Sequence, residues 1–211
     1  MFRIKICGIT RMEDVLAVVH SGADAVGFQM SCGPRKISKG VARQLTKKLP
    51  PWITPVGVLV NESLSTVRML VRFCNFQVIQ LHGQESSEFC SKIHVPILKA
   101  IRMEHSQSYQ PFREFPIAAF LLDSYNKYQV GGTGRLFNWR WVQTAKKRLP
   151  KPIMLAGGLT PGNVRRAIHI GRPFGVDVSS GVEIHPGQKD HRLISLFVKR
   201  AQAQFLKMNN G

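Results

Sequence analysis

The sequence predicts a closed barrel of eight parallel strands, each followed by a helix. Apolar runs of strand length alternate with amphipathic stretches of helical length from one end of the chain to the other. No linker or low-complexity stretch interrupts this alternation, and 211 residues are enough for one barrel without a second domain. We therefore expect a single-domain (β/α)8 barrel over residues 1–211, with an open doubly wound sheet as the alternative.

The elements are expected in strict alternation. The strand-like runs lie near residues 2–7, 24–29, 54–60, 77–82, 97–101, 118–123, 152–156 and 174–178. The helical stretches lie near residues 11–21, 39–48, 64–74, 86–93, 104–114, 139–148, 161–170 and 189–206.

Capping patterns predict where two of the helices begin and where one ends. Thr10 and Glu13 have the spacing of a capping box, and Gly22 is placed to close the helix that follows. Thr160 stands before Pro161, which predicts an N-cap and a proline at the first helical position. The seventh helix is therefore expected to start at this pair.

The chain is strongly basic. Thirty Lys and Arg against twelve Asp and Glu give a formal net charge of +18. The basic residues are spread along the chain, and no RRM, KH, zinc-finger or helix-turn-helix signature is present. We therefore expect no specific nucleic-acid partner, and interpret the charge as a solvated surface or a field that attracts anionic metabolites.

The sequence predicts a cytoplasmic protein without a membrane anchor. No apolar run reaches the roughly 18 to 20 residues needed to cross a bilayer, and no signal-peptide pattern is present. The four cysteines, Cys7, Cys32, Cys74 and Cys90, show no CxxC pair and no zinc-like spacing. Free thiols in a reducing compartment and no metal site are expected.

The candidate active site lies where the strands end. In a barrel of this kind the loops after the carboxyl ends of the strands build the active site. Those eight tips carry Cys7-Gly8, "QMSCGPRKIS", Asn61-Glu62, "QLHGQE", Arg102, "LLDS", "LAGGLT" and "VDVSSGVE". Polar and reactive residues therefore cluster at one end of the barrel.

Strand side chains alternate between two faces, which predicts what points inward. Cys7 and Lys5 share one face of the first strand, opposite to Ile4 and Ile6. The same alternation directs four polar side chains to the barrel interior: Lys5, Gln80, His82 and Asp177. A buried charge needs a partner, so a contact between Lys5 and Asp177 across neighbouring strands is expected.

Asp123 and Arg35 are candidates for proton transfer and carboxylate binding. Asp123 ends "AAFLLD", and an acid near apolar walls can have a raised pKa and donate a proton. A turn or helix cap is the alternative for this residue. The loop that follows, "SYNKYQVGGTG", contains Gly132 and other glycines that could fold over a ligand. Arg35 could bind a planar carboxylate through two hydrogen bonds, or be an ordinary surface arginine.

Two further tips predict an anion site. Gly157 and Gly158 lead into the seventh helix, and Ser179 and Ser180 follow the eighth strand, where Ser180 and Glu183 could cap a short helix. Glycine lets a backbone approach closely, and free N–H groups at a helix start carry positive partial charge. A phosphate seat is expected here, and simple tight turns are the alternative.

A lysine nucleophile is another alternative. Lys5 or Lys99 could form a Schiff base, which would imply an aldolase-like enzyme. A lysine needs a lowered pKa for this role, and nothing in the sequence requires one.

An ordered set of motifs resembles the phosphoribosylanthranilate isomerase family over nearly the whole chain. These are "KICGIT", "GADAVGF", "VGVLVNES", "QLHG", "LLDS" with "GGTG" and "FNW", "LAGGLTPGNV", "VDVSSGVE" and "PGQKD". The resemblance implies a TIM barrel of the ribulose-phosphate-binding type. It also implies a cofactor-free Amadori rearrangement of N-(5-phosphoribosyl)anthranilate in tryptophan biosynthesis.

The same resemblance implies residue roles. Cys7 would be the general base and Asp123 the general acid, while Arg35 would meet the anthranilate carboxylate. The loops around Gly157 and Ser179 would hold the phosphate. The remaining expected substrate-binding residues are Gln80, His82, Gly132, Gly158, Asp177 and Ser180. The expected partner is a small sugar-phosphate substrate, and the expected assembly is a monomer or homodimer.

Two positions depart from the family pattern, and two other functions stay open. The loop that carries Arg35 is about one residue shorter than usual, and Asn138 stands where the family commonly has Asp. The aminoaldose isomerase of histidine biosynthesis performs the same rearrangement but has an aspartate at the position of Cys7. A binder of RNA or other polyanions through the basic surface is the third class, and its affinity would fall steeply with salt.

Overall fold

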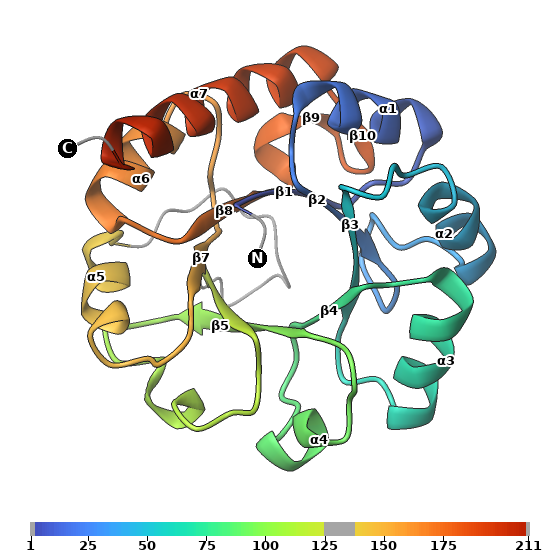
Figure 1. Ribbon diagram of the computed structural model, residues 1–211, viewed down its shortest axis with the longest axis horizontal. Helices are drawn as coiled ribbons and strands as arrows, with labels where there is room; N and C mark the ends of the chain where they lie inside the picture. The colour runs from blue at the N-terminus through green and yellow to red at the C-terminus, as the bar shows by residue number, and fades with distance from the viewer. Residues whose placement is uncertain (1–2, 125–137, 210–211) are drawn as a thin grey trace.

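Eight parallel strands form a closed barrel in a computed structural model that describes residues 3–124 and 138–209 (Figure 1). Each strand pairs with the next along the chain, and the eighth pairs with the first. The strands are β1 Ile4–Cys7, β2 Ala25–Gln29, β3 Thr54–Leu59, β4 Val78–Leu81, β5 Ile97–Met103, β6 Ala119–Ser124, β7 Ile153–Leu155 and β8 Gly175–Val178. The predicted (β/α)8 barrel is confirmed, and the open-sheet alternative is wrong.

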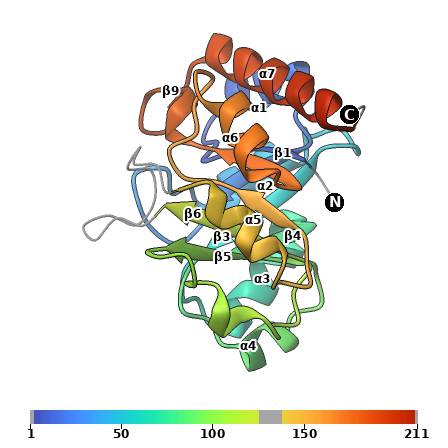
Figure 2. The same cartoon turned by 90° about the vertical axis from the view of Figure 1, so that its left-hand side faces the viewer.

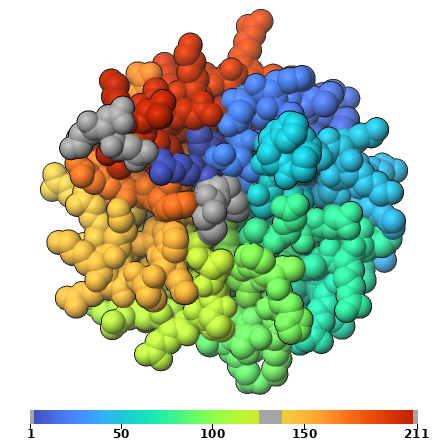
Figure 3. Space-filling view, in the orientation of Figure 1, coloured from blue at the N-terminus to red at the C-terminus, as the bar shows by residue number. Residues whose placement is uncertain are grey.

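A ring of helices surrounds the barrel (Figures 1 and 2). The helices are α1 Met12–Ser21, α2 Lys39–Thr46, α3 Leu64–Cys74, α4 Ser87–Ser91, α5 Arg140–Lys146, α6 Val164–Gly171 and α7 His191–Asn209. Helix α7 packs against both α6 and α1, so the last segment of the chain lies beside the first (Figure 3). A short hairpin, β9 Glu183–His185 with β10 Gln188–Lys189, follows β8. Within the described residues no helix is long and apolar enough to cross a membrane.

The apolar side chains form two layers, as the alternation of strand residues predicts. The outer layer lies between strands and helices and includes Ile4, Phe28 and Phe120. The inner layer fills the barrel and consists of Ala25, Val56, Val78, Leu98, Ala100, Ala119, Leu121, Met154 and Ala156. Small residues alternate with larger ones in this layer, so the barrel is a packed core rather than a channel.

The helix predicted over residues 104–114 is wrong. Only one 3₁₀ turn, Gln110–Phe112, lies between β5 and β6. The Ser108 hydroxyl accepts hydrogen bonds from the backbone N–H groups of Glu104 and His105, which holds a turn instead of a helix start. Pro111 then lacks the N–H that a continuing helix needs.

Both predicted N-caps are wrong, whereas the predicted helix end is confirmed. The Thr10 hydroxyl donates to the carbonyl of Gly187 at 2.5 Å instead of capping α1. Helix α6 begins at Val164 and not at the Thr160-Pro161 pair. The backbone N–H of Thr160 instead donates to the side chain of Asn163 at 2.8 Å, which shapes a turn before the helix. Gly22 ends α1 in the left-handed conformation, at φ 77°.

A buried ion pair joins β5 to the loop after β4, and its carboxylate also holds the loop after β3. Lys99 faces the helices and not the barrel interior, and its Nζ lies 2.6 Å from Oε2 of Glu85 and 2.8 Å from the carbonyl of Gly83. The Glu85 carboxylate also accepts the backbone N–H groups of Asn61 and Gly83. Lys99 is therefore a structural residue outside the barrel, which argues against its candidate role as a Schiff-base lysine.

We predict that Glu85→Gln lowers the free energy of unfolding by about 3 kcal/mol, because it leaves the Lys99 charge buried without a counter-ion. The ion pair lowers the pKa of Glu85 below its ordinary value of 4.5. Its contribution is therefore complete above pH 4.5 and declines as the pH falls through the pKa of the folded state. Urea unfolding at several pH values measures both effects.

The control for this prediction is Glu88→Gln, because Glu88 pairs with Lys92 on the exposed surface. This variant is expected to unfold at the same urea concentration as the parent protein. Equal stability of the Glu85 and Glu88 variants would contradict the structural role of the buried pair.

Candidate functional site

A small pocket opens at the carboxyl ends of the strands, where the sequence predicts the active site. Its free volume is about 70 Å³. Side chains from six strands and from the loops that follow them meet there. The lining residues are Cys7, Gln29, Ser31, Cys32, Arg35, Val58, Val60, Gln80, His82, Asp123, Asp177 and Ser179.

Cys7 ends β1 and is buried in this pocket, with 4% of its surface exposed. Burial raises the pKa of its thiol, while the nearby Lys5 ammonium opposes that rise and Asp177 adds to it. Lys5 Nζ lies 2.8 Å from Oδ1 of Asp177, which confirms the contact predicted between β1 and β8. Gly27 on β2 leaves room for the side chains of Cys7 and Lys5, since a Cβ there would lie 2.7 Å from the Cys7 sulfur and 3.0 Å from Nζ of Lys5.

Asp123 ends the inward-facing row of β6 and lies beside His82 of the β4 tip. The two side chains approach to 3.3 Å, between Nε2 of His82 and Oδ2 of Asp123, without hydrogen-bond geometry. Oδ1 of Asp123 accepts the backbone N–H of Ser124 at 2.8 Å. Gln80 Nε2 lies 3.4 Å from Nδ1 of His82. One carboxylate oxygen is therefore fixed by the backbone, and the other faces the pocket and the imidazole.

Arg35 crosses the tip of β1 and is held by a buried carboxylate. Its Nε and Nη2 donate to the two oxygens of Glu183 at 2.7 and 2.6 Å. The Lys189 ammonium lies 2.8 Å from the same carboxylate and donates to the carbonyl of Ser179 at 3.1 Å. Gly8 makes this path possible, because its φ is +76° and a Cβ there would lie 2.5 Å from Cδ of Arg35.

The predicted anion seat lies beside the pocket. Gly157 and Gly158 both adopt left-handed backbone conformations, at φ 80° and 64°. Neither donates a backbone hydrogen bond to another described residue. Across from them Ser179 precedes the 3₁₀ turn Ser180–Val182, and its buried hydroxyl has no partner among the described residues.

Unpartnered polar atoms gather at this site. Four buried side-chain atoms in the described residues have no hydrogen-bond partner. Three of them, on Gln80, His82 and Ser179, belong to residues that line the pocket. Buried polar groups are normally satisfied, so these atoms mark where a polar ligand would complete the network. No three His, Cys, Asp or Glu side chains of residues 3–124 and 138–209 form a group that could hold a metal ion.

Most residues predicted for the site meet at this end of the barrel. The pocket brings together Cys7, Arg35, Gln80, His82, Asp123, Asp177 and Ser179. Gly157, Gly158 and Ser180 lie on the loops after β7 and β8, where the sequence predicts the anion seat. Gly132 lies outside the described residues.

The sequence interpretation missed two residues that organise the site. It assigned Glu183 to a helix cap, which is wrong, because this carboxylate binds Arg35 and Lys189 instead. Lys189 stands in the polar segment "PGQKD", so nothing in the local pattern predicts that its side chain is fully buried. One signal in the sequence was available, namely the scarcity of acidic residues. Asp177 is the single acidic residue of 138–182, so the next acid, Glu183, was a candidate counter-ion for a buried cation.

We predict that the Cys7 thiolate forms only above pH 9 in the ligand-free protein, because burial raises its pKa above the ordinary value of 9.0. The double variant Lys5→Met/Asp177→Asn is expected to raise the pKa of Cys7 further. The reason is that the Lys5 ammonium lowers this pKa more than the Asp177 carboxylate raises it, and the variant removes both. The ultraviolet absorbance of the thiolate, followed against pH with Cys32, Cys74 and Cys90 replaced, measures both values. A thiolate signal at neutral pH would contradict the prediction.

The family of the chain follows from its relatives. The family model described as N-(5'phosphoribosyl)anthranilate (PRA) isomerase matches residues 4–200. The N-(5'-phosphoribosyl)anthranilate isomerases of Geotalea uraniireducens and Thermotoga neapolitana are each 45% identical, over 96% of this chain and 99% of theirs.

Solved structures agree with these relatives. Phosphoribosyl anthranilate isomerase from Thermotoga maritima is 41% identical, with a TM-score of 0.88 over 96% of this chain and 100% of that one. A phosphoribosyl anthranilate isomerase solved with reduced 1-(o-carboxyphenylamino)-1-deoxyribulose 5-phosphate is 40% identical, with a TM-score of 0.85 over the same shares. The chain belongs to the N-(5'-phosphoribosyl)anthranilate isomerase family.

Proposed function

We propose that this chain catalyses the Amadori rearrangement of N-(5-phosphoribosyl)anthranilate to 1-(2-carboxyphenylamino)-1-deoxyribulose 5-phosphate in tryptophan biosynthesis. The observation that carries this proposal is the meeting of a thiol, a carboxyl group and an arginine in one pocket, in a chain of this family. The reaction needs one acid and one base, and the pocket supplies a candidate for each. We further propose that residues 1–211 act as one domain in the cytoplasm, without a cofactor.

Asp123 is the proposed general acid and Cys7 the proposed general base. Protonated Asp123 gives its proton to the ring oxygen as the bond from that oxygen to C1′ breaks. The anilino nitrogen forms a Schiff base with C1′. The Cys7 thiolate then removes the proton from C2′, and the electrons of the C–H bond form an enol. The electron pair of the Schiff base returns to the nitrogen as the enol forms. Cys7 then returns its proton to C1′ while the enol hydroxyl gives its proton to Asp123, which yields the ketone and restores both groups.

The protonation states that this mechanism requires are the reverse of the ordinary ones. A thiol ordinarily keeps its proton and a carboxyl group loses it at neutral pH. Burial raises the pKa of Cys7 further, and the Lys5 ammonium is the group that favours its thiolate most. Lys5 itself keeps its charge, because Asp177 raises the pKa of Lys5 in spite of burial. The ion pair between β1 and β8 thereby supports the base.

Arg35 is the proposed partner of the anthranilate carboxylate, and Glu183 and Lys189 are proposed to position it. A guanidinium has five N–H donors, and Glu183 occupies one on Nε and one on Nη2. The edge formed by Nη1 and Nη2 stays free to bind a second carboxylate in a bidentate manner. Lys189 offsets the charge of Glu183, so that this carboxylate does not repel the anionic substrate.

The substrate phosphate is proposed to bind between the loops after β7 and β8. The backbone N–H groups of Gly157 and Gly158 and the hydroxyl of Ser179 have no partner among the described residues. We also propose a monomer or homodimer. One solved relative is described as monomers generated from the dimeric isomerase of Thermotoga maritima.

We predict that Cys7→Ser and Asp123→Asn each abolish turnover, because each removes one of the two groups that move protons. The loss of substrate fluorescence with freshly made phosphoribosylanthranilate measures this activity. Both variants are expected to keep the circular dichroism of the parent and its affinity for a product analogue. Full activity in either variant would remove the assigned role, and an inactive parent protein would remove the proposed function.

We predict that Glu183→Gln raises KM by about tenfold with a smaller effect on kcat. Glutamine has one side-chain oxygen, which cannot replace both carboxylate oxygens as acceptors for Nε and Nη2 of Arg35. Glu183→Asp, which keeps the carboxylate, is expected to recover part of this loss. A fall in kcat alone, with KM unchanged, would show that Glu183 does not act through substrate binding.

A further inference from the structure

The segment from β2 to β4 is almost free of acids. Residues 25–84 contain eight Lys and Arg and one acidic residue, Glu62. Helices α2 and α3 carry four of these eight cations and pack against each other on the outer layer of the barrel. This surface is separate from the pocket at the strand ends, whose lining shares no residue with it.

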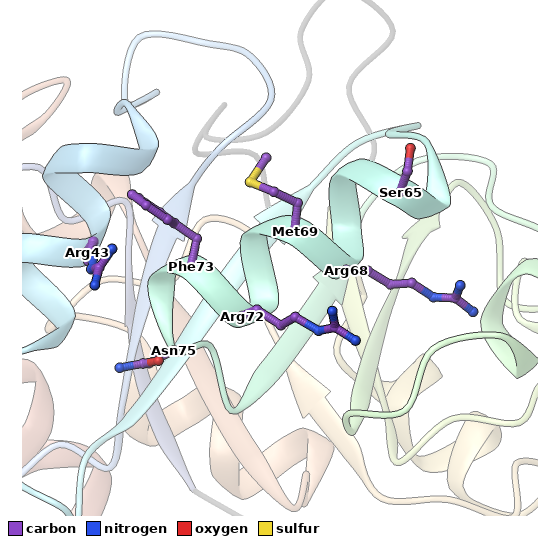
Figure 4. Close-up of a pocket in the computed structure, with 7 residues that line it drawn as sticks. All are labelled: Arg43, Ser65, Arg68, Met69, Arg72, Phe73 and Asn75. Atoms are coloured by element: carbon purple, nitrogen blue, oxygen red, sulfur yellow. The ribbon is translucent and has the colours of Figure 1, made fainter.

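A groove of about 680 Å³ lies along this pair of helices (Figure 4). Its lining residues are Arg43, Ser65, Arg68, Met69, Arg72, Phe73 and Asn75. Figure 4 shows Phe73 extending from α3 toward α2, where Arg43 lies beside it. Arg68 and Arg72 extend from the other side of α3. We call this surface the arginine groove.

The cations of the arginine groove form two rows. Lys39 and Arg43 are four residues apart on α2, and Arg68 and Arg72 are four residues apart on α3. All four side chains are exposed, and none of them forms an ion pair within the described residues. Like charges at this spacing weaken a helix, so these rows work against the local stability of α2 and α3.

The groove continues on the far side of α3. A second hollow of about 310 Å³ lies between α3 and the segment after α4, and Arg68 and Arg72 line this hollow as well. His94 is exposed there and offers a flat ring on which a base could stack. The remaining lining of this hollow is apolar and consists of Val67, Val71, Ile93 and Val95, so the basic surface extends across α3 through Arg68 and Arg72.

We propose that the arginine groove binds the phosphate backbone of single-stranded RNA without sequence preference. Extended basic grooves with exposed guanidinium groups are typical of sites that bind this backbone. An acidic peptide fits the arginine groove itself less well, because a peptide site is centred on an open apolar pocket and the aliphatic side chains lie beyond α3, outside this groove. In the arginine groove the Phe73 ring is instead covered by the cations of Arg43, at 4.6 Å, and Lys39, at 5.6 Å.

The test is the fluorescence anisotropy of a labelled oligouridylate with the full-length protein over a series of salt concentrations. The parent protein is expected to bind, with an affinity that falls as salt rises. The triple variant Arg43→Gln/Arg68→Gln/Arg72→Gln is expected to bind about tenfold or more weakly. Its plot of log affinity against log salt is expected to be shallower by about 2, because each lost phosphate contact contributes about 0.7. Its isomerase activity is expected to stay unchanged.

The matched control is Arg140→Gln/Arg165→Gln/Arg166→Gln, which removes three exposed arginines from α5 and α6. This variant carries the same net charge as the first triple variant and is expected to bind RNA nearly as well as the parent protein does. An equal loss in both triple variants would overturn the proposal in favour of diffuse attraction. If the first variant does not fold, Arg43→Gln/Arg72→Gln replaces it, with an expected slope change of about 1.4.

Two further outcomes would overturn the proposal. The first is the absence of RNA binding by the parent protein at about 0.05 M salt, where such contacts are strongest. The second is displacement of the RNA by polyglutamate at equal charge concentration, together with weaker binding of polyglutamate to the same triple variant. That result would assign the groove to an acidic protein partner.

Discussion

The barrel depends on a few acids that neutralise cations held inside the molecule. Three carboxylates serve four buried cations: Asp177 pairs with Lys5, Glu85 with Lys99, and Glu183 with both Arg35 and Lys189. A buried charge without a partner is costly, so none of these contacts can be lost singly without destabilising the fold. Two of these contacts, between Lys5 and Asp177 and between Arg35 and Glu183, join segments that are distant in sequence. The pair of Lys5 and Asp177 closes the barrel between its first and last strands.

This demand for internal counter-ions accounts for part of the basic surface. The chain has twelve acids, and several of the others also make structural contacts. Asp24 accepts the backbone N–H groups at the start of β1, Asp14 binds Arg11 and His191, and Asp190 holds the first turn of α7. Few acids therefore remain to pair with exposed Lys and Arg, and the field outside the protein is positive. Such a field attracts anionic metabolites and polyanions alike.

The sequence predicted the barrel and the inward row of site residues because both follow from short-range rules. A strand alternates its faces, so the positions of Cys7, Asp123 and Lys5 relative to the interior were determined by parity. The caps expected at Thr10 and Glu183 failed because distant partners outcompeted local ones. Thr10 bonds to Gly187, and Glu183 bonds to a guanidinium from the loop after β2. A side chain whose partner lies more than a hundred residues away leaves no mark in its own neighbourhood.

The buried ion pairs also connect the fold to the chemistry of the pocket. Lys189 neutralises the carboxylate that holds Arg35, and it also fixes the carbonyl of Ser179 on the loop after β8. One buried ammonium therefore connects the proposed carboxylate-binding and phosphate-binding ends of the site. Its charge also lowers the pKa of Cys7, which lies between those two ends. Burial lowers the pKa of Lys189 itself, and Glu183 opposes that change. The ion pair thus favours the charged form of Lys189 in the region proposed to hold both substrate anions and the thiolate.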